Sequence, residues 1–223
     1  MNKDFFVQKL QTYKSELKPG ENLLIVSKTR PVEEIQAYYD LGQRDFGENR
    51  VQELSEKAEH FKDSCPDIRW HMIGNIQSNK INQLFEIPGL WAIHSVDDKD
   101  MLKKMVKAQG RLKHAVNIFL QYNTSEEDEK AGFEDYESLK QTACMIQNSS
   151  RLILKGLMTM GTLRTENREA EARRCFKELH SLTTKLGQDL GLKLETSMGM
   201  SGDYKVALEE RSKWIRLGTV MFP

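Results

Sequence analysis

The sequence predicts a single (β/α)8 TIM barrel, an α/β fold, and three observations support this prediction. Short apolar runs alternate with segments whose apolar residues recur at helical spacing. Eight such runs fit into 223 residues, which suits a compact barrel. No proline-, glycine- or serine-rich linker divides the chain, so we expect one domain over residues 1–223. A doubly wound open sheet is the alternative, because counting strands in a sequence does not distinguish the two.

The expected strands are short and buried. The first contains four consecutive apolar residues, Leu23 to Val26, and is followed by Arg30 and Pro31. Such a run, ended by turn residues, is typical of a parallel strand that is covered on both faces. The expected strands are 23–29, 45–48, 69–74, 91–96, 115–122, 153–159, 195–199 and 214–219.

The segments between the strands show helix starts and stops. Pro31 suits a first helical turn, and Gly42 fits the end of the same helix. A second helix is expected over 97–109, with Asp97 as its N-cap and Gly110 closing it.

Three further helices are expected. Residues 166–190 predict a long helix with a charged outer face, and residues 204–210 a short one. An extra helix should precede the first strand, because apolar side chains recur at helical spacing between Phe5 and Leu17.

Composition excludes several classes of function. Lysine plus arginine equals aspartate plus glutamate, which argues against nucleic acid or an anionic membrane as the main partner. No apolar stretch approaches the roughly 20 residues that span a bilayer, and the N-terminus lacks a secretory signal pattern. Cys65, Cys144 and Cys175 are scattered, which predicts reduced thiols in a cytoplasmic protein without a disulfide framework or zinc site.

Lys28 is the first candidate functional residue, because it follows directly on the first apolar run. We expect it at the carboxyl end of a barrel strand, where active sites of this fold lie. Burial there would disfavour the ammonium form and leave a nucleophilic amine suited to a Schiff base. The alternative is a lysine that extends to solvent and carries an ordinary charge.

Two loops after the seventh and eighth expected strands predict a phosphate site. Ser201 and Gly202 stand just before a helical segment, and Gly218 and Thr219 follow the last strand. Hydroxyls and flexible glycines at these two loops often hold a phosphate group in barrels.

Arg216 lies within the last expected strand, between Ile215 and Leu217. A buried guanidinium needs a partner, since an unpaired charge is costly to desolvate. The partner is either a nearby carboxylate or a ring nitrogen of a bound ligand. His71 and His94 also lie within strands, where hydrogen-bonded core histidines are the more common interpretation than acid–base groups.

Several motifs, in order along the chain, resemble the pyridoxal phosphate homeostasis protein family, which is similar to the N-terminal barrel of alanine racemase. The motifs span almost the whole chain. They are Val26-Ser27-Lys28-Thr29, Phe46-Gly47-Glu48-Asn49, His71-Met72-Ile73-Gly74, Gln77-Ser78-Asn79-Lys80, Gly156-Leu157-Met158-Thr159-Met160, Ser197-Met198-Gly199-Met200-Ser201 and Arg216-Leu217-Gly218-Thr219.

The resemblance implies a PLP fold-type III barrel that binds pyridoxal 5′-phosphate (PLP). Lys28 would form the internal aldimine, and Asn49 would lie beside the cofactor. Arg216 matches the arginine that faces the pyridine nitrogen. The phosphate would be held by Ser201, Gly218 and Thr219.

The resemblance also implies binding, buffering and delivery of PLP, with apo PLP-dependent enzymes as partners and little or no catalysis. An arginine beside the ring nitrogen weakens the cofactor as an electron sink. A racemase adds a second domain, whereas this sequence ends at Pro223, so we expect a monomer. The alternatives are a racemase or lyase of small amino acids, with Lys28 and His71 or Tyr204 as proton carriers, and a barrel that binds another phosphate ligand.

Overall fold

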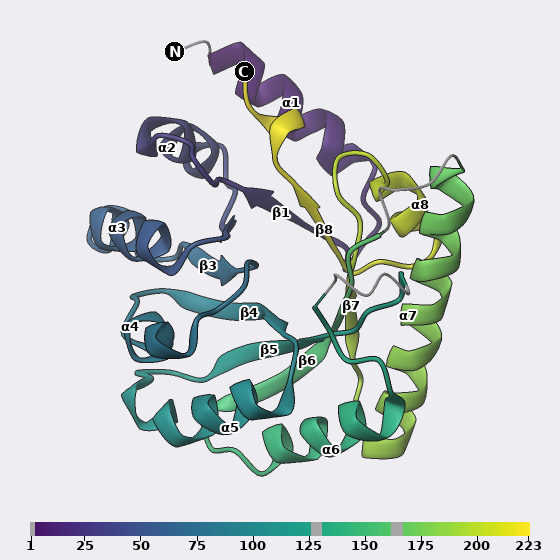
Figure 1. Ribbon diagram of the computed structural model, residues 1–223. Helices are drawn as coiled ribbons and strands as arrows, with labels where there is room; N and C mark the ends of the chain where they lie inside the picture. Colours follow the sequence, from purple (N-terminus) through teal and green to yellow (C-terminus); the bar gives the residue numbers. More distant parts are fainter. Residues whose placement is uncertain (1–2, 126–130, 162–166) are drawn as a thin grey trace.

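The computed structural model describes residues 3–125, 131–161 and 167–223, in which eight parallel strands close into a barrel (Figure 1). Each strand pairs with the next along the chain, and the last pairs with the first over four residue pairs. The barrel prediction is confirmed, and the open-sheet alternative is wrong, because this last pairing removes both sheet edges. The strands are β1 Asn22–Val26, β2 Asp45–Glu48, β3 Arg69–Met72, β4 Leu90–Val96, β5 Val116–Gln121, β6 Leu152–Met158, β7 Glu195–Ser197 and β8 Trp214–Leu217.

Helices surround the barrel, and the predicted extra helix, α1, precedes β1. In Figure 1, α1 lies beside the C-terminal turn η3, with which it is in contact. No helix in the described residues has both the length and the apolar character needed to cross a bilayer. The helices are α1 Lys3–Ser15, α2 Val32–Asp40, α3 Val51–Phe61, α4 Ile81–Phe85, α5 Lys99–Ala108, α6 Tyr136–Gln147, α7 Arg168–Leu190 and α8 Tyr204–Glu209, with short 3-10 turns η1 Ser78–Lys80, η2 Gln109–Arg111 and η3 Thr219–Met221.

Some predicted element ends differ from the structure. Asp98 rather than Asp97 caps α5, because its side chain accepts the backbone N–H of Met101 at 2.7 Å. Gly110 does not end α5, because the helix ends at Ala108 and Gly110 lies within the following 3-10 turn η2. The start of the helix predicted over 166–190 falls at residue 166, which lies outside the described residues.

Side chains of β1 alternate between two cores, as the pleat of a strand requires. Leu23 and Ile25 pack in the main core of the protein. Leu24 belongs to a second, smaller cluster, formed by Leu24, Ala92, Phe119, Met158 and Trp214 from five different strands. Continuing the alternation past Leu24 brings Val26 and then Lys28 to the inner side, where both line a cavity.

Candidate functional site

A cavity of about 490 Å³ lies at the carboxyl ends of the strands, where barrels carry their active sites. It receives side chains from residues that are far apart in the sequence. All six residues predicted for the site line it: Lys28, Asn49, Ser201, Arg216, Gly218 and Thr219. The other described residues that line it are Val26, Ile73, Gly74, Asn75, Asp97, Gln121, Ala131, Met160, Met200 and Gly202.

Lys28 is exposed, so the prediction that it is buried is wrong. The apolar run predicted a strand over 23–29, but β1 ends at Val26. Thr29 has a φ of 62°, in the left-handed region that few residues other than glycine adopt. This turn ends the strand, and Lys28 therefore reaches the open cavity from the loop that follows it.

A buried lysine on α3, Lys57, holds the backbone on the N-terminal side of Lys28. Its ammonium group donates three hydrogen bonds of 2.7 Å, to the carbonyl of Ser27 and to the carboxylates of Glu48 and Glu53. An ammonium group has three protons, so all of its donors are satisfied.

The same network holds the backbone on the C-terminal side of Lys28. Glu53 accepts the N–H of Thr29 at 2.6 Å, while Glu48 accepts the hydroxyl of Ser27 at 2.7 Å. We call Lys57, Glu48 and Glu53 the Lys57 network. It fixes the peptide groups on both sides of Lys28 and leaves the lysine side chain free to enter the cavity.

Glu48 is fully buried in this network. Burial raises its pKa to about 7, and the nearby Lys57 ammonium opposes that rise. Its second oxygen, Oε2, has no hydrogen-bond partner among the described residues.

Asn49 lines the cavity just after β2, where its backbone passes close to Gly74 in the loop after β3. A Cβ atom on Gly74 would lie 2.2 Å from the carbonyl oxygen of Asn49, far inside any allowed contact. Glycine is therefore required at position 74. Ser95 adds a hydroxyl bond of 2.6 Å to the carbonyl of Gly74 and fixes this end of β3.

The two predicted phosphate loops meet at the cavity, where Ser201 and Gly202 come from one loop and Gly218 and Thr219 from the other. The first loop is closed by Asp203, which accepts the N–H of Met200 at 2.6 Å. Burial raises the pKa of Asp203. The two loops thus present two hydroxyl groups and two glycines to one space.

Arg216 is 4% exposed, and its guanidinium group has neutral partners. Nη1 donates to the Ser197 hydroxyl at 2.8 Å and Nη2 to the Thr159 carbonyl at 2.9 Å. In the described part of the chain no carboxylate forms an ion pair with it, so the salt-bridge interpretation is wrong there. Burial lowers the pKa of Arg216 to about 10, which still leaves it a cation at neutral pH.

His71 and His94 are fully buried and hydrogen-bonded to each other, with 3.0 Å between His71 Nδ1 and His94 Nε2. The prediction of hydrogen-bonded core histidines is confirmed. Neither residue lines the cavity, and neither does Tyr204, whose hydroxyl bonds to Glu16. None of them is placed to carry a proton to a ligand there.

Sequence reasoning missed three polar residues of the cavity, Asn75, Asp97 and Gln121. Gln121 is the last residue of β5, and Asp97 directly follows β4. Burial raises the pKa of Asp97. Their position at strand ends was the available signal, since polar residues there face the mouth of a barrel.

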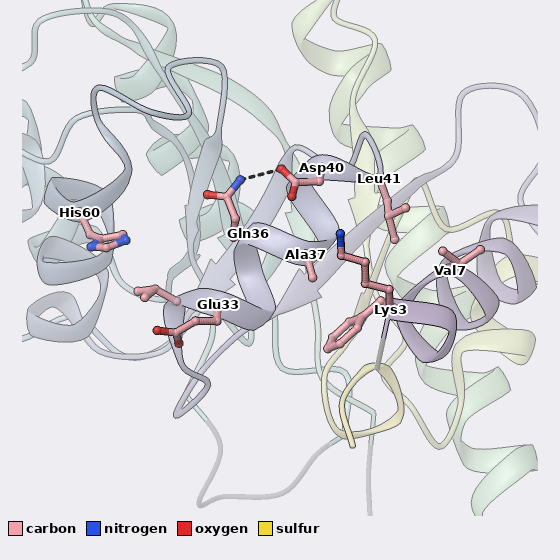
Figure 2. A pocket seen from close by; sticks show the side chains of 10 residues that line it. Lys3, Val7, Glu33, Gln36, Ala37, Asp40, Leu41 and His60 are labelled. Atoms are coloured by element: carbon pink, nitrogen blue, oxygen red, sulfur yellow. Dashed lines mark hydrogen bonds between the residues drawn. The ribbon is translucent and has the colours of Figure 1, made fainter. Parts of the chain in front are cut away.

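A second cavity, of about 460 Å³, lies outside the barrel and is shown in Figure 2. The described residues that line it come from α1, α2, the turn after α2, and α3. Gln36 donates to Asp40 at 2.7 Å across one turn of α2, as the dashed line shows. It contains no convergent set of reactive groups, so we place the functional site in the strand-end cavity.

The family model for the alanine racemase N-terminal domain matches residues 2–223. The pyridoxal phosphate homeostasis protein of Schizosaccharomyces pombe is 35% identical over 205 residues, which cover 91% of this chain and 84% of the relative. Both matches extend across nearly the whole chain.

Two solved structures of PipY from Synechococcus elongatus have the same fold. The structure without PLP has a TM-score of 0.89 at 34% identity, and the structure with PLP bound has 0.85 at 32%. In each case the match covers 98% of this chain and 100% of the other.

Proposed function

The chain belongs to the pyridoxal phosphate homeostasis protein family, and we propose that it binds PLP in the strand-end cavity in order to carry, buffer and deliver it. One observation carries the proposal. The cavity combines an accessible lysine, Lys28, with a buried cation, Arg216, that has only neutral partners in the described residues. PLP has an aldehyde that suits the first group and a ring nitrogen that suits the second.

The residues present fit each part of the cofactor. Lys28 Nζ would hold the cofactor covalently through its aldehyde group. Arg216 would donate to the ring nitrogen and keep it unprotonated. Ser201 and Thr219 offer hydroxyl groups, and Gly218 a close backbone approach, for the phosphate. Asn49 would lie beside the ring.

Two features support a carrier with little or no turnover. PLP supplies an electron sink when bound, and a donor such as Arg216 at the ring nitrogen weakens that sink. Of the side chains considered as proton carriers, Lys28 lines the cavity, but His71 and Tyr204 do not. We therefore propose a monomeric cytoplasmic barrel that releases PLP to apo enzymes, and the free cysteines fit a reducing compartment.

The first test is the visible spectrum of the purified protein with added PLP, followed by borohydride reduction and peptide mapping. We expect a new absorption band and a reduced pyridoxyl group on Lys28. Lys28→Ala should lose both, while the surface control Lys113→Ala keeps them. The melting temperature of cofactor-free Lys28→Ala should match the wild type, because Lys28 is exposed. Absence of band and adduct in the wild type would refute the proposal.

A second test separates carrier from enzyme. We expect transfer of PLP to an apo acceptor enzyme without exchange of amino-acid α-protons into deuterated water. Steady α-proton exchange that depends on Lys28 would instead establish a racemase or lyase.

A further inference from the structure

A continuous path of hydrogen bonds leads from the cavity through the inside of the barrel. Arg216 Nη1 lies 2.8 Å from Ser197 Oγ, which lies 2.9 Å from His94 Nδ1. His94 Nε2 lies 3.0 Å from His71 Nδ1, and His71 Nε2 lies 3.0 Å from Asp45 Oδ1. We call these five residues the histidine network.

The network joins the two ends of the barrel. Arg216 lines the cavity at the carboxyl ends of the strands. Asp45 is the first residue of β2 and lines a separate cavity with Arg69, the first residue of β3. The five members come from five different strands: Asp45 from β2, His71 from β3, His94 from β4, Ser197 from β7 and Arg216 from β8. Such a path exists only because the barrel is closed.

When both imidazoles are neutral, the donors and acceptors along the histidine network allow a single placement of the protons. An ionised Asp45 can only accept, so His71 carries its proton on Nε2 and accepts at Nδ1. His94 must then donate from Nε2 and accept at Nδ1, where the Ser197 hydroxyl donates. Arg216 can only donate, and the Ser197 oxygen accepts its proton. Every bond therefore points in the same direction, from Arg216 to Asp45.

Charges around the network agree with this arrangement. Burial lowers the pKa of His71 and lowers that of His94 further, so both are neutral at pH 7. Burial alone would raise the pKa of Asp45, but the hydrogen bond from His71 and the charge of Arg69 outweigh it and lower the pKa. Asp203 also acts on Arg216 through space, although burial raises the pKa of Asp203.

We propose that Asp45, His71, His94 and Ser197 are positioning residues, which fix the orientation of the Arg216 guanidinium and connect its charge to the Asp45 carboxylate at the opposite end of the barrel. Arg216 lines the cavity, and its donors that are bonded neither to Ser197 nor to Thr159 stay available to a ligand. They select a flat ligand whose ring nitrogen is an unprotonated acceptor. This last consequence rests on the proposed function, whereas the positioning of Arg216 does not.

The first experiment uses cofactor-free protein labelled with ¹⁵N at histidine and arginine. Long-range ¹H–¹⁵N spectra at pH 7 should show His71 and His94 as neutral tautomers with the proton on Nε2. The Arg216 Nη signals should be separate, because the guanidinium does not rotate freely. Ser197→Ala should broaden those signals and bring them closer together, since of the two bonds only that from Nη2 to the Thr159 carbonyl remains. The control Ser212→Ala removes another fully buried serine hydroxyl, bonded to the carbonyls of Met198 and Trp214, and should leave them separate.

A Nδ1–H tautomer or a cationic ring at either histidine would overturn the proposal. So would Arg216 signals that respond equally to Ser197→Ala and Ser212→Ala. Circular dichroism of both variants confirms that each is folded, so a change in the arginine signals cannot be assigned to unfolding.

The second experiment measures PLP affinity and the absorption maximum of the loaded protein. Removing a hydrogen bond that orients a charged group should weaken binding roughly tenfold or more in Ser197→Ala and shift the maximum. Ser212→Ala should change neither, and equal effects in the two variants would contradict the ligand-selecting role. If the wild type binds no PLP, the proposed function fails, while the tautomer and arginine signals still decide whether the network positions Arg216.

Discussion

Two buried networks serve the cavity, and they stabilise charge in opposite ways. In the Lys57 network the charged groups touch, with 2.7 Å from the ammonium group to each carboxylate. In the histidine network the cation and the anion are separated by a serine and two neutral imidazoles. The first acts on backbone groups around Lys28, and the second acts on a side chain, Arg216.

The difference follows from what each network must leave accessible. In the proposed function Lys28 has to remain mobile enough to react, and only its flanking peptide groups are held by the Lys57 network. In the same proposal Arg216 keeps donors for a ligand, and a carboxylate in direct contact would occupy them and neutralise the charge. The neutral Ser197 hydroxyl accepts one hydrogen bond from the guanidinium, and it neither occupies the other donors nor neutralises the charge.

The largest expected effect comes from removing Lys57. Lys57→Met leaves the Glu48 carboxyl buried without a cation and should lower the free energy of unfolding by about 3 kcal/mol or more. Urea unfolding at pH 7 measures this. The control is Lys62→Met, since Lys62 and its partner Glu59 are 43% and 63% exposed, and its loss should be below about 1 kcal/mol. Similar losses in the two variants would show that the Lys57 network contributes no more than a surface pair.

The two networks should also oppose each other in pH dependence. Glu48 has a pKa of about 7 when folded against an ordinary value of 4.5, so between these values the folded state binds the extra proton. Its contribution to stability therefore falls as pH rises through this window. His71 and His94 have lowered pKa values, so there the unfolded state binds more protons and stability rises with pH through about 6.5.

Glu48→Gln separates the two contributions. Removing the Glu48 titration should make the increase of unfolding free energy between pH 5 and 6.5 steeper, by up to about 1.4 kcal/mol per pH unit. Urea unfolding at four pH values across this window measures the slope. An unchanged slope in Glu48→Gln would mean that Glu48 is already ionised in the folded protein at pH 5.

Sequence reasoning found the barrel and the cavity residues because these depend on local patterns. Apolar runs mark the strands, and polar residues at their ends mark the mouth of the barrel. The burial of Lys57 had no such signal, since a lysine four residues after Glu53 on a helix is typical of a solvated surface pair. Its burial depends on how closely α3 packs on β2 and β3.

The histidine network could not be predicted from the sequence, for a related reason. His71 and His94 were each predicted as hydrogen-bonded core residues, but their partners lie 23 to 103 positions away in the sequence. Only the register of the closed barrel brings Asp45, His94 and Ser197 into one path. The exposure of Lys28 was mispredicted because β1 ends at Val26, before the predicted end of the run, and the chain then turns through Thr29, which has a positive φ.

A smaller effect is expected at the far end of the histidine network. Asp45→Asn keeps an oxygen that can accept from His71 but removes the charge, and it should lower unfolding free energy by about 1–2 kcal/mol. The control Asp67→Asn changes a carboxylate that is 58% exposed and bonded to Arg44, so its effect should be smaller. In the Asp45→Asn, Lys57→Met double variant the losses should add within about 0.5 kcal/mol if the two networks are independent. Strong coupling would show that they are one unit.

The smallest effect is expected at Thr29, where the Lys57 network meets the left-handed turn. Thr29→Gly removes a backbone cost of about 1 kcal/mol at positive φ but adds a similar amount of unfolded-state freedom, so stability should change by less than about 0.5 kcal/mol. Thr29→Ala is the matched variant, because both variants lose the hydroxyl that donates to the Lys28 carbonyl at 2.6 Å, and only Thr29→Ala keeps the backbone cost. It should be the less stable of the two in urea unfolding. The opposite order would mean that the positive φ at position 29 costs alanine less than the freedom that glycine adds to the unfolded chain.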